Sequence, residues 1–538
     1  MTVTGAEECF DYIVVGAGSA GCVLANRLTA SGRHRTLVLE AGGADRNIWL
    51  HIPLGYGRHF TNPAVNWLYM TEPEPDCGNR RIIAPRGKVL GGSSSINGLI
   101  YVRGQPQDFD HWRQLGNVGW SFDDVLPYFR QAESNERGAD PWHGAEGPLA
   151  VSDARDAHPL ADAFLAAAEQ CGHRRNADFN GAAQEGFGYY QTTTRNGRRC
   201  STARAYLKPA RRRSNLVVIP CALATRVRFE ERRAVGVEYL VGAQRRTARA
   251  AREVILAGGA FNSPQLLQLS GLGPAALLRS CGIEVLVDHP GIGAELQDHY
   301  QARLVYRCAQ PGTLNDTVGS LRRRLAAALR YGVMRRGMLT VPAIVAGGFF
   351  RTDPALATPD LQGSIALFSA DEVGDRLHSF SGFTGIATLL RPQSRGHVRI
   401  KSADPRDPPL IQPRYLSAER DRVTILAGFK ALRRIFEAPA MARHVAAEHE
   451  PGPQCQSDAD LIDHIRRRGL TVFHPTSTCR MGTDSTAVVD ARLRVHGVEA
   501  LRVIDASIMP TVVSGNTNAA TIMIAEKGAD MVLADACA

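Results

Sequence analysis

The sequence predicts an α/β fold in which a doubly wound, Rossmann-like dinucleotide-binding domain carries an inserted α+β domain on an antiparallel sheet. Three observations support this prediction. A glycine-rich turn follows the first apolar run of the chain. Apolar runs of strand length recur far downstream, and the stretches between them mix amphipathic helix, alternating strands and proline-rich turns. With 538 residues the chain also exceeds the size of one hydrophobic core, so several domains are expected.

The predicted first domain opens with a β-α-β unit. Residues 10–15 are a short apolar run typical of a buried parallel strand, residues 19–30 are predicted to form a helix, and residues 36–40 a second strand. Two later core strands are each expected to be followed by a helix. These pairs are 253–257 with 263–270, and 501–504 with 519–533.

The second domain is expected to interrupt the first. Residues 320–331 have the pattern of an amphipathic helix, residues 397–401 alternate like a strand, and residues 405–413 are rich in proline. The predicted boundaries divide the chain into two sets of segments. They are 1–155, 210–310 and 466–538 for the dinucleotide-binding domain, and 156–209 and 311–465 for the inserted, substrate-binding domain.

The net charge of +10 comes mainly from arginine. Because no basic stretch is interleaved with aromatic residues, no nucleic-acid partner is expected, and most of this charge is interpreted as solvated surface. Peripheral contact with an anionic membrane stays open. No apolar run reaches the ~20 residues of a membrane span, and the start of the chain, with Glu7 and Glu8, does not resemble a secretion signal. A cytoplasmic location is therefore expected, with the inner membrane face as an alternative.

The eleven cysteines are scattered and contain no CxxC pair. This pattern predicts neither a disulfide framework nor a zinc site, so no metal is expected.

The glycine-rich turn after the first predicted strand fits the spacing GxGxxG. Gly16 permits the tight turn, Gly18 lets the backbone approach a pyrophosphate, and Gly21 allows the helix to pack closely on the strand. Glu40 ends the next strand, where a carboxylate accepts hydrogen bonds from a ribose diol and repels a 2′-phosphate. The pattern predicts a dinucleotide site and disfavours NADP, but it leaves FAD and NAD open.

Three further segments resolve this choice. Residues 86–98 read RGKVLGGSSSING, residues 259–273 read GAFNSPQLLQLSGLG, and residues 474–520 contain HPTSTCRMG, DASIMP and GNTNAA. Together with the first turn they resemble the signatures of the glucose–methanol–choline (GMC) family of FAD oxidoreductases, in family order. The family regions are expected at residues 10–305 and 390–530.

The resemblance implies that the cofactor is FAD. The histidine that carries covalent flavin in choline oxidases aligns with Ile96, so the FAD is expected to be non-covalent. The residues expected to hold it, by motif or by resemblance, are Gly16, Gly18, Ser19, Ala20, Gly21, Glu40, Ala41, Arg86, Gly91, Gly92, Ser93, Asn97, Gly98, Leu99, Val227, Ala257, Gly258, Ser263, Asp505, Ala506, Asn516, Thr517 and Ala519.

Among sixteen histidines, His474 stands out because it lies in a Ser/Thr-rich polar loop and precedes Pro475, which favours an extended or loop backbone. By resemblance it aligns with the family's histidine beside flavin N5, and Asn518 aligns with a position that holds Asn or His. Hydride leaves an alcohol carbon readily only as the hydroxyl proton is lost, so His474 is expected to be the base and Asn518 to orient the hydroxyl. The predicted reaction oxidises an alcohol to the aldehyde by hydride transfer to flavin N5.

The substrate pocket is expected to include Val345, Phe349 and Phe473. Family members that bind choline often carry a Glu just before the AGGF segment, and Val345 stands there in this chain. A quaternary ammonium needs an anion or an aromatic cage, so an uncharged primary alcohol is favoured over choline.

Several alternatives stay open. Choline dehydrogenase is the nearest, and a hydroxynitrile lyase with a structural flavin is the alternative of another class. A nicotinamide-dependent reductase is disfavoured because the chain has no second GxGxxG turn. Oxygen, a quinone or a protein carrier can each be the electron acceptor.

Overall fold

The predicted β-α-β start is confirmed in the computed structural model, which describes residues 8–537. β1 (Cys9–Val15) runs parallel to β2 (Thr36–Leu39), and α1 (Ser19–Leu28) connects them. Every residue of β2 is buried, as expected for a strand covered on both faces. Residues 1–7, and with them Glu7, on which the expectation about secretion partly rests, lie outside the described residues.

The first sheet collects strands from distant parts of the chain. Its order is β10-β2-β1-β13-β12-β11, with β24 beside β13, and the strands around β1 are parallel. The antiparallel β11 and β12 extend one side, so β13 is much longer than the strand predicted at 253–257. The bounds are β10 (Leu216–Ile219), β11 (Ala222–Glu230), β12 (Arg233–Val241), β13 (Gln244–Leu256) and β24 (Leu501–Val503).

The second sheet is antiparallel, as predicted, with the order β22-β16-β19-β18-β17-β7 and β23 beside β16. Helices α4 (Pro159–Gln170) and α10 (Glu419–Glu437) pack on one face through a shared apolar cluster. The strands are β7 (Gly186–Tyr189), β16 (Tyr300–Cys308), β17 (Ile344–Phe350), β18 (Leu361–Ala366), β19 (Gly382–Leu389), β22 (Val445–Glu450) and β23 (Leu470–Thr471).

The predicted domain boundaries need one correction. β16 and β23 belong to the second sheet, although residues 210–310 and 466–538 were assigned to the first domain. Both strands are mostly buried, and the residues of a strand do not reveal which sheet it joins.

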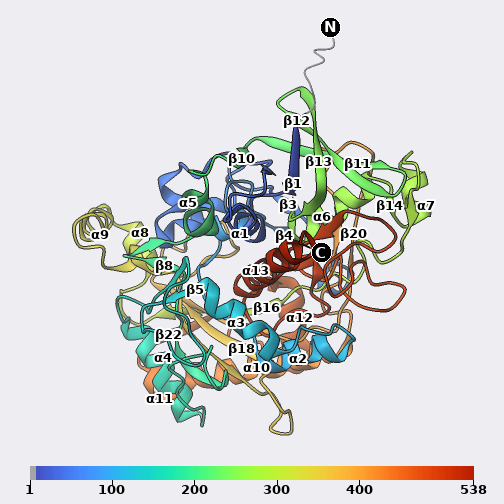
Figure 1. Cartoon of the computed structure of the whole chain (residues 1–538). Coiled ribbons are helices and arrows are strands. Elements are labelled where there is room, and N and C mark those ends of the chain that lie inside the picture. The colour runs from blue at the N-terminus through green and yellow to red at the C-terminus, as the bar shows by residue number, and fades with distance from the viewer. Residues whose placement is uncertain (1–7, 538) are drawn as a thin grey trace.

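Helix α13 (Thr517–Asp535) lies between the parts of the molecule built on the two sheets (Figure 1). It packs on α1, where the Arg27 guanidinium and the Glu526 carboxylate form an ion pair of 2.5 Å. α9 (Leu321–Met334), the confirmed amphipathic helix, lies at the outer edge with α8 (Leu314–Gly319). Within the described residues, no helix is both long enough and apolar enough to cross a membrane.

The remaining elements are short or peripheral. The helices are α2 (Pro106–Gln114), α3 (Phe122–Ala132), α5 (Lys208–Ala210), α6 (Gly259–Leu269), α7 (Ala275–Ser280), α11 (Pro439–Ala442) and α12 (Asp458–Arg468). The strands are β3 (Tyr69–Met70), β4 (Ile83–Ala84), β5 (Glu133–Asn135), β6 (Leu149–Val151), β8 (Thr194–Arg195), β9 (Arg198–Arg199), β14 (Leu272–Gly273), β15 (Val287–Asp288), β20 (His397–Arg399) and β21 (Leu410–Gln412).

Candidate active site

A cavity of about 360 Å³ runs from the carboxyl ends of the first sheet's parallel strands to the open face of the second sheet. This is the edge at which α/β sheets bind their ligands. Gln301 and Arg303 of β16, with Thr384 and Thr388 of β19, line its far end. The cavity therefore joins a nucleotide half to a substrate half.

Two glycine turns meet at the nucleotide half. A Cβ on Gly16, whose φ is +101°, would lie 2.5 Å from the carbonyl oxygen of Ala257, and one on Gly92 would lie 2.6 Å from the Cα of Gly18. No side chain caps the first amides of α1, and its first turn holds no acidic residue. Bare backbone and free helix amides therefore face the cavity, as a pyrophosphate requires.

Two carboxylates fix the loops around these turns. Glu40 accepts hydrogen bonds of 2.8 Å from the amides of Ala17 and Gly42, while burial raises its pKa to about 7. Asp505 accepts from the amide of Gly259 and the hydroxyl of Ser263. It thereby ties the loop after β24 to the start of α6.

Most of the residues predicted to hold FAD line this cavity. They are Gly16, Gly18, Ser19, Ala20, Glu40, Ala41, Arg86, Gly92, Ser93, Asn97, Gly98, Leu99, Ala257, Gly258, Ser263, Asp505, Ala506, Asn516 and Thr517. Gly98 faces open space, since a Cβ there would meet no atom within 4 Å.

The four other predicted residues, Gly21, Gly91, Val227 and Ala519, lie behind the cavity wall. Gly21 packs α1 on the turn, because a Cβ would lie 1.8 Å from the carbonyl oxygen of Gly16. The Val227 amide already donates to the Ser270 hydroxyl at 2.8 Å, and residues 222–224 form the wall nearby. The predicted backbone contact of Val227 with the nucleotide stays a prediction, and residues 222–224 are the part of this strand that lines the cavity.

His474 lies on the cavity wall and contacts a second buried histidine that the sequence did not single out. The Nδ1 atoms of His474 and His299 are 2.9 Å apart, and Nε2 of His299 is 3.1 Å from the carbonyl oxygen of Leu390. That carbonyl can only accept, so Nε2 of neutral His299 carries the proton and its Nδ1 is an acceptor. His474 must then donate from Nδ1, and its Nε2 is an unprotonated acceptor.

The hydrogen bond between His474 and an asparagine is made by Asn516. Its Nδ2 lies 3.2 Å from Nε2 of His474, and its Oδ1 is buried without a hydrogen-bond partner among the described residues. Asn518 also lines the cavity, but its Oδ1 accepts from the Ser19 hydroxyl at 2.8 Å. Asn516 therefore makes the direct contact with His474, while the orienting role of Asn518 stays a prediction.

The surroundings of His474 keep its imidazole neutral. Burial lowers its pKa well below the usual value, and His299 and the Arg86 guanidinium lower it further. Burial also lowers the pKa of His299, to about 4. The backbone is held by Asp298, which accepts from the His474 amide at 2.8 Å.

Of the three residues predicted for the substrate pocket, Phe473 lines the cavity and the other two do not. Val345 packs in the apolar core under the second sheet, and Phe349 lies in a cluster with Phe179 and Tyr190. A register shift between Ile344 and Ala346 turns Ile344 to the cavity instead. The argument against choline that rested on Val345 is therefore withdrawn.

Comparison with known proteins agrees with this geometry. The N-terminal family model described as GMC oxidoreductase matches residues 10–301, and the C-terminal one matches residues 392–525. The chain belongs to the GMC oxidoreductase family.

Relatives of this GMC oxidoreductase include an alcohol dehydrogenase [acceptor] of Pseudomonas putida, 43% identical over 97% of this chain and 96% of the relative. Mitochondrial choline dehydrogenase of Mus musculus is 43% identical over 98% and 90% of the two chains. The structure of pyridoxine 4-oxidase from Mesorbium loti superposes with a TM-score of 0.88 at 31% identity, covering 97% of this chain and 98% of that one.

Family membership and the cavity together define the class of this GMC oxidoreductase. It is an FAD-dependent enzyme that oxidises CH–OH groups. The two glycine turns and Gly98 fit that cofactor, because an added Cβ would take up space beside it. The uncapped amides of α1 fit its pyrophosphate. The start of α13 at Thr517, also without a side-chain cap, points further free amides at the cavity.

Proposed function

We propose that this GMC oxidoreductase oxidises an uncharged primary alcohol to the aldehyde, with His474 as the base and Asn516 as the orienting residue. Bound FAD supplies the hydride acceptor at N5. The observation that carries the proposal is the unprotonated Nε2 of His474 on the cavity wall, which accepts a 3.2 Å hydrogen bond from the Asn516 amide. A neutral imidazole with its acceptor nitrogen in the cavity is the form that takes a hydroxyl proton.

The alcohol loses a proton and a hydride, either together or one after the other. The hydroxyl proton passes to Nε2 of His474, and its bonding pair stays on oxygen and forms the carbonyl. The α-hydrogen leaves carbon with both bonding electrons, which reduces the flavin. The resulting imidazolium still donates from Nδ1 to His299, so the proton gain needs no rearrangement of that pair.

Asn516 contributes by orientation. When the substrate hydroxyl occupies Nε2, the Asn516 amide is free to donate to the hydroxyl oxygen and hold the carbon in line for hydride loss. Its location at the N-cap of α13 fixes the side chain to a rigid element. Asn518, bonded to Ser19, serves the packing of the two helix starts instead.

The lining of the substrate half supports a neutral alcohol. Phe60, Phe368 and Phe473 provide apolar contacts, and the charged group on the second sheet is Arg303. The carboxylates among the described lining residues, Glu40 and Asp505, belong to the nucleotide half. A choline cation would therefore meet a positive charge without a facing anion.

The FAD is proposed to be non-covalent, because Ile96 offers no nucleophile at the position where choline oxidases attach it. Oxygen, a quinone and a protein carrier stay open as acceptors. A hydroxynitrile lyase with structural flavin remains the alternative of another class, and choline dehydrogenase is the alternative that several relatives favour.

Anaerobic mixing of the FAD-loaded protein with a panel of alcohols tests the proposal. We expect neutral primary alcohols to bleach the flavin absorbance and choline to do so much more slowly. Faster reduction by choline would favour choline dehydrogenase, and no reduction by any alcohol, with cleavage of a cyanohydrin, would favour the lyase. Admitting air or a quinone analogue afterwards identifies the acceptor.

A further inference from the structure

Helix α9 lies at the outer edge of the molecule (Figure 1). It carries a stripe of exposed apolar side chains. Leu325, Leu329 and Val333 are 63%, 68% and 75% exposed. Of twelve exposed large apolar residues in the described chain, six belong to this region and the others are mostly scattered. The six, which we call the α9 stripe, are Val318, Leu321, Leu325, Leu329, Val333 and Met334.

The helix is attached to the protein through its opposite side. Tyr331 is its buried residue, and Ala327, one turn earlier, is half-buried. Leu321, Leu325, Leu329 and Val333 recur every four residues, so they share one face, and that face points away from the body. The stripe therefore does not complete the core of the chain.

Arginines flank the stripe. Arg322 and Arg324 are exposed, and their guanidinium groups have no ion pair or hydrogen bond with any described residue, whereas Arg323 and Arg330 contact Asp316 and Asp156 at 3.9 and 3.3 Å. Residues 321–337 contain no Asp or Glu. The surface around the stripe is therefore positive, and its complement is anionic.

We infer that α9 docks on an anionic phospholipid surface. A helix with an apolar face, bordered by arginines, binds in the interface plane by burying that face among acyl chains while the guanidinium groups meet lipid phosphates. A second copy of the chain fits less well, because pairing through α9 would set two rows of arginines against each other. A membrane supplies both the apolar depth and the negative charge.

Docking through α9 also brings the active-site cavity towards the membrane. α9 packs on the turn Met338–Thr340, that turn packs on Pro53–His59, and Tyr56 of the latter lines the cavity. This consequence rests on the proposed function: an alcohol or a quinone dissolved in lipid would have a short path to the flavin. The docking itself does not depend on turnover.

Co-sedimentation of the FAD-loaded protein with vesicles tests the inference. We expect binding to vesicles of phosphatidylcholine mixed with phosphatidylglycerol, weaker binding to phosphatidylcholine alone, and a decrease with added salt. The double substitution Leu325→Glu/Leu329→Glu should lower binding roughly tenfold or more. Arg322→Ser/Arg324→Ser should remove mainly the salt-dependent part.

Val423→Glu is the matched control. Val423 on α10 is 61% exposed and lies outside the stripe, so this variant should bind vesicles like the parent. Flavin content and flavin reduction by alcohol in solution should be unchanged in all variants, which separates lost docking from lost folding or function. Equal binding by the parent and the Leu325→Glu/Leu329→Glu variant, or no binding to anionic vesicles, would overturn the inference. So would a dimer, seen by light scattering, that this double variant dissociates.

Discussion

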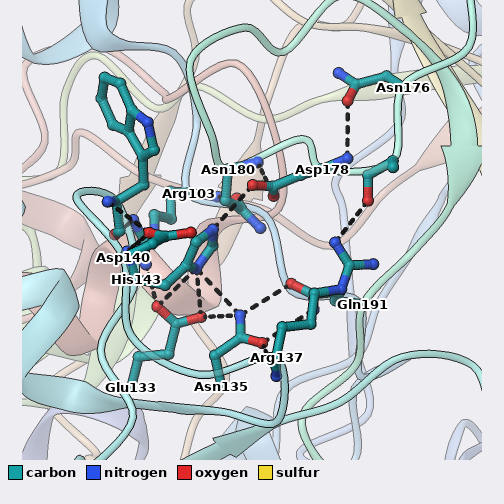
Figure 2. Close-up of polar contacts among 12 residues, drawn as sticks. Arg103, Glu133, Asn135, Arg137, Asp140, His143, Asn176, Asp178, Asn180 and Gln191 are labelled. Atoms are coloured by element: carbon teal, nitrogen blue, oxygen red, sulfur yellow. Dashed lines mark hydrogen bonds and ion pairs between the residues drawn. The ribbon is translucent and has the colours of Figure 1, made fainter.

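Two buried histidine sites in this protein have opposite protonation. His474 and His299 touch each other on the cavity wall, and burial lowers the pKa of both. His143 lies between two carboxylates, with Nδ1 3.0 Å from Glu133 and Nε2 3.0 Å from Asp178 (Figure 2). Burial alone would lower its pKa too, but the hydrogen bonds to Asp178 and Glu133 outweigh it and raise the pKa to about 9.

Burial favours the neutral imidazole at both sites, and only the carboxylate partners of His143 outweigh it. An imidazole whose hydrogen bonds go to a neutral imidazole and an amide stays neutral and keeps a lone pair for chemistry. One that bridges two carboxylates is an imidazolium and has no lone pair left. The first arrangement suits a base, and the second suits a structural clamp.

The clamp joins two parts of the chain. Glu133 also pairs with the buried Arg103, and the Arg103 amide donates to Asn180 at 2.9 Å. Asp178 and Asn180 lie just before β7, so these contacts tie the first domain to the edge of the second sheet (Figure 2).

The largest effect is expected at the base. His474→Ala should slow flavin reduction by the alcohol roughly 10²–10⁴-fold, because no other group takes the hydroxyl proton. The FAD should stay bound, since the phosphate turns are distant from the substitution in the chain. Stopped-flow absorbance of the flavin measures the rate, and a variant as fast as the parent would remove His474 from the mechanism.

The clamp should govern stability at alkaline pH. The pKa of His143 rises on folding from 6.5 to about 9, so its contribution, at most about 3 kcal/mol before solvent screening, is fully present below pH 6.5. This stabilisation should be lost as the pH rises through 9. The charged groups that face the His143 ring are Arg103, Glu133 and Asp178. Thermal melting from pH 6 to 10 measures it. His143→Gln should flatten this profile while flavin reduction at neutral pH stays near the parent rate, and a parallel profile in both proteins would contradict the prediction.

His299 should act through His474, as a positioning residue. His299→Phe removes the acceptor for the Nδ1 proton, and we expect flavin reduction to slow by roughly tenfold to a hundredfold. His299→Gln, which keeps an acceptor, should recover part of the rate. In a plot of the flavin reduction rate against pH, the acid limb of the parent should lie below the ordinary imidazole pKa. In His299→Phe this limb should move to higher pH, because His299 helps to lower the pKa of His474. A purely structural role would leave the position of that limb unchanged.

The outcome at each residue shows what a sequence can predict. The turn from Gly16 to Gly21 was predictable because its glycines, strand and helix are local, and His474 was indicated by its Ser/Thr-rich polar loop and the family signature there. His299 carried no such mark, since it lies 175 residues from His474 and meets it only in the fold. Val345 was misplaced because a register shift, which no alternation reveals, decides which face of β17 it joins.

Which of Asn516 and Asn518 contacts His474 is likewise decided by the fold and not by the local sequence. The smallest expected effect on the rate of flavin reduction concerns these two residues. The two residues lie at the N-cap and in the first turn of α13, about 200° apart around the helix axis, so only one of them reaches His474. Asn516→Ala should slow flavin reduction about tenfold, because the hydroxyl loses a donor that holds it in line. Asn518→Ala, the matched control two positions away, should lose only its bond to Ser19 and reduce flavin near the parent rate. The reverse ranking in single-turnover measurements would return the role to Asn518 and imply that α13 starts in a different register.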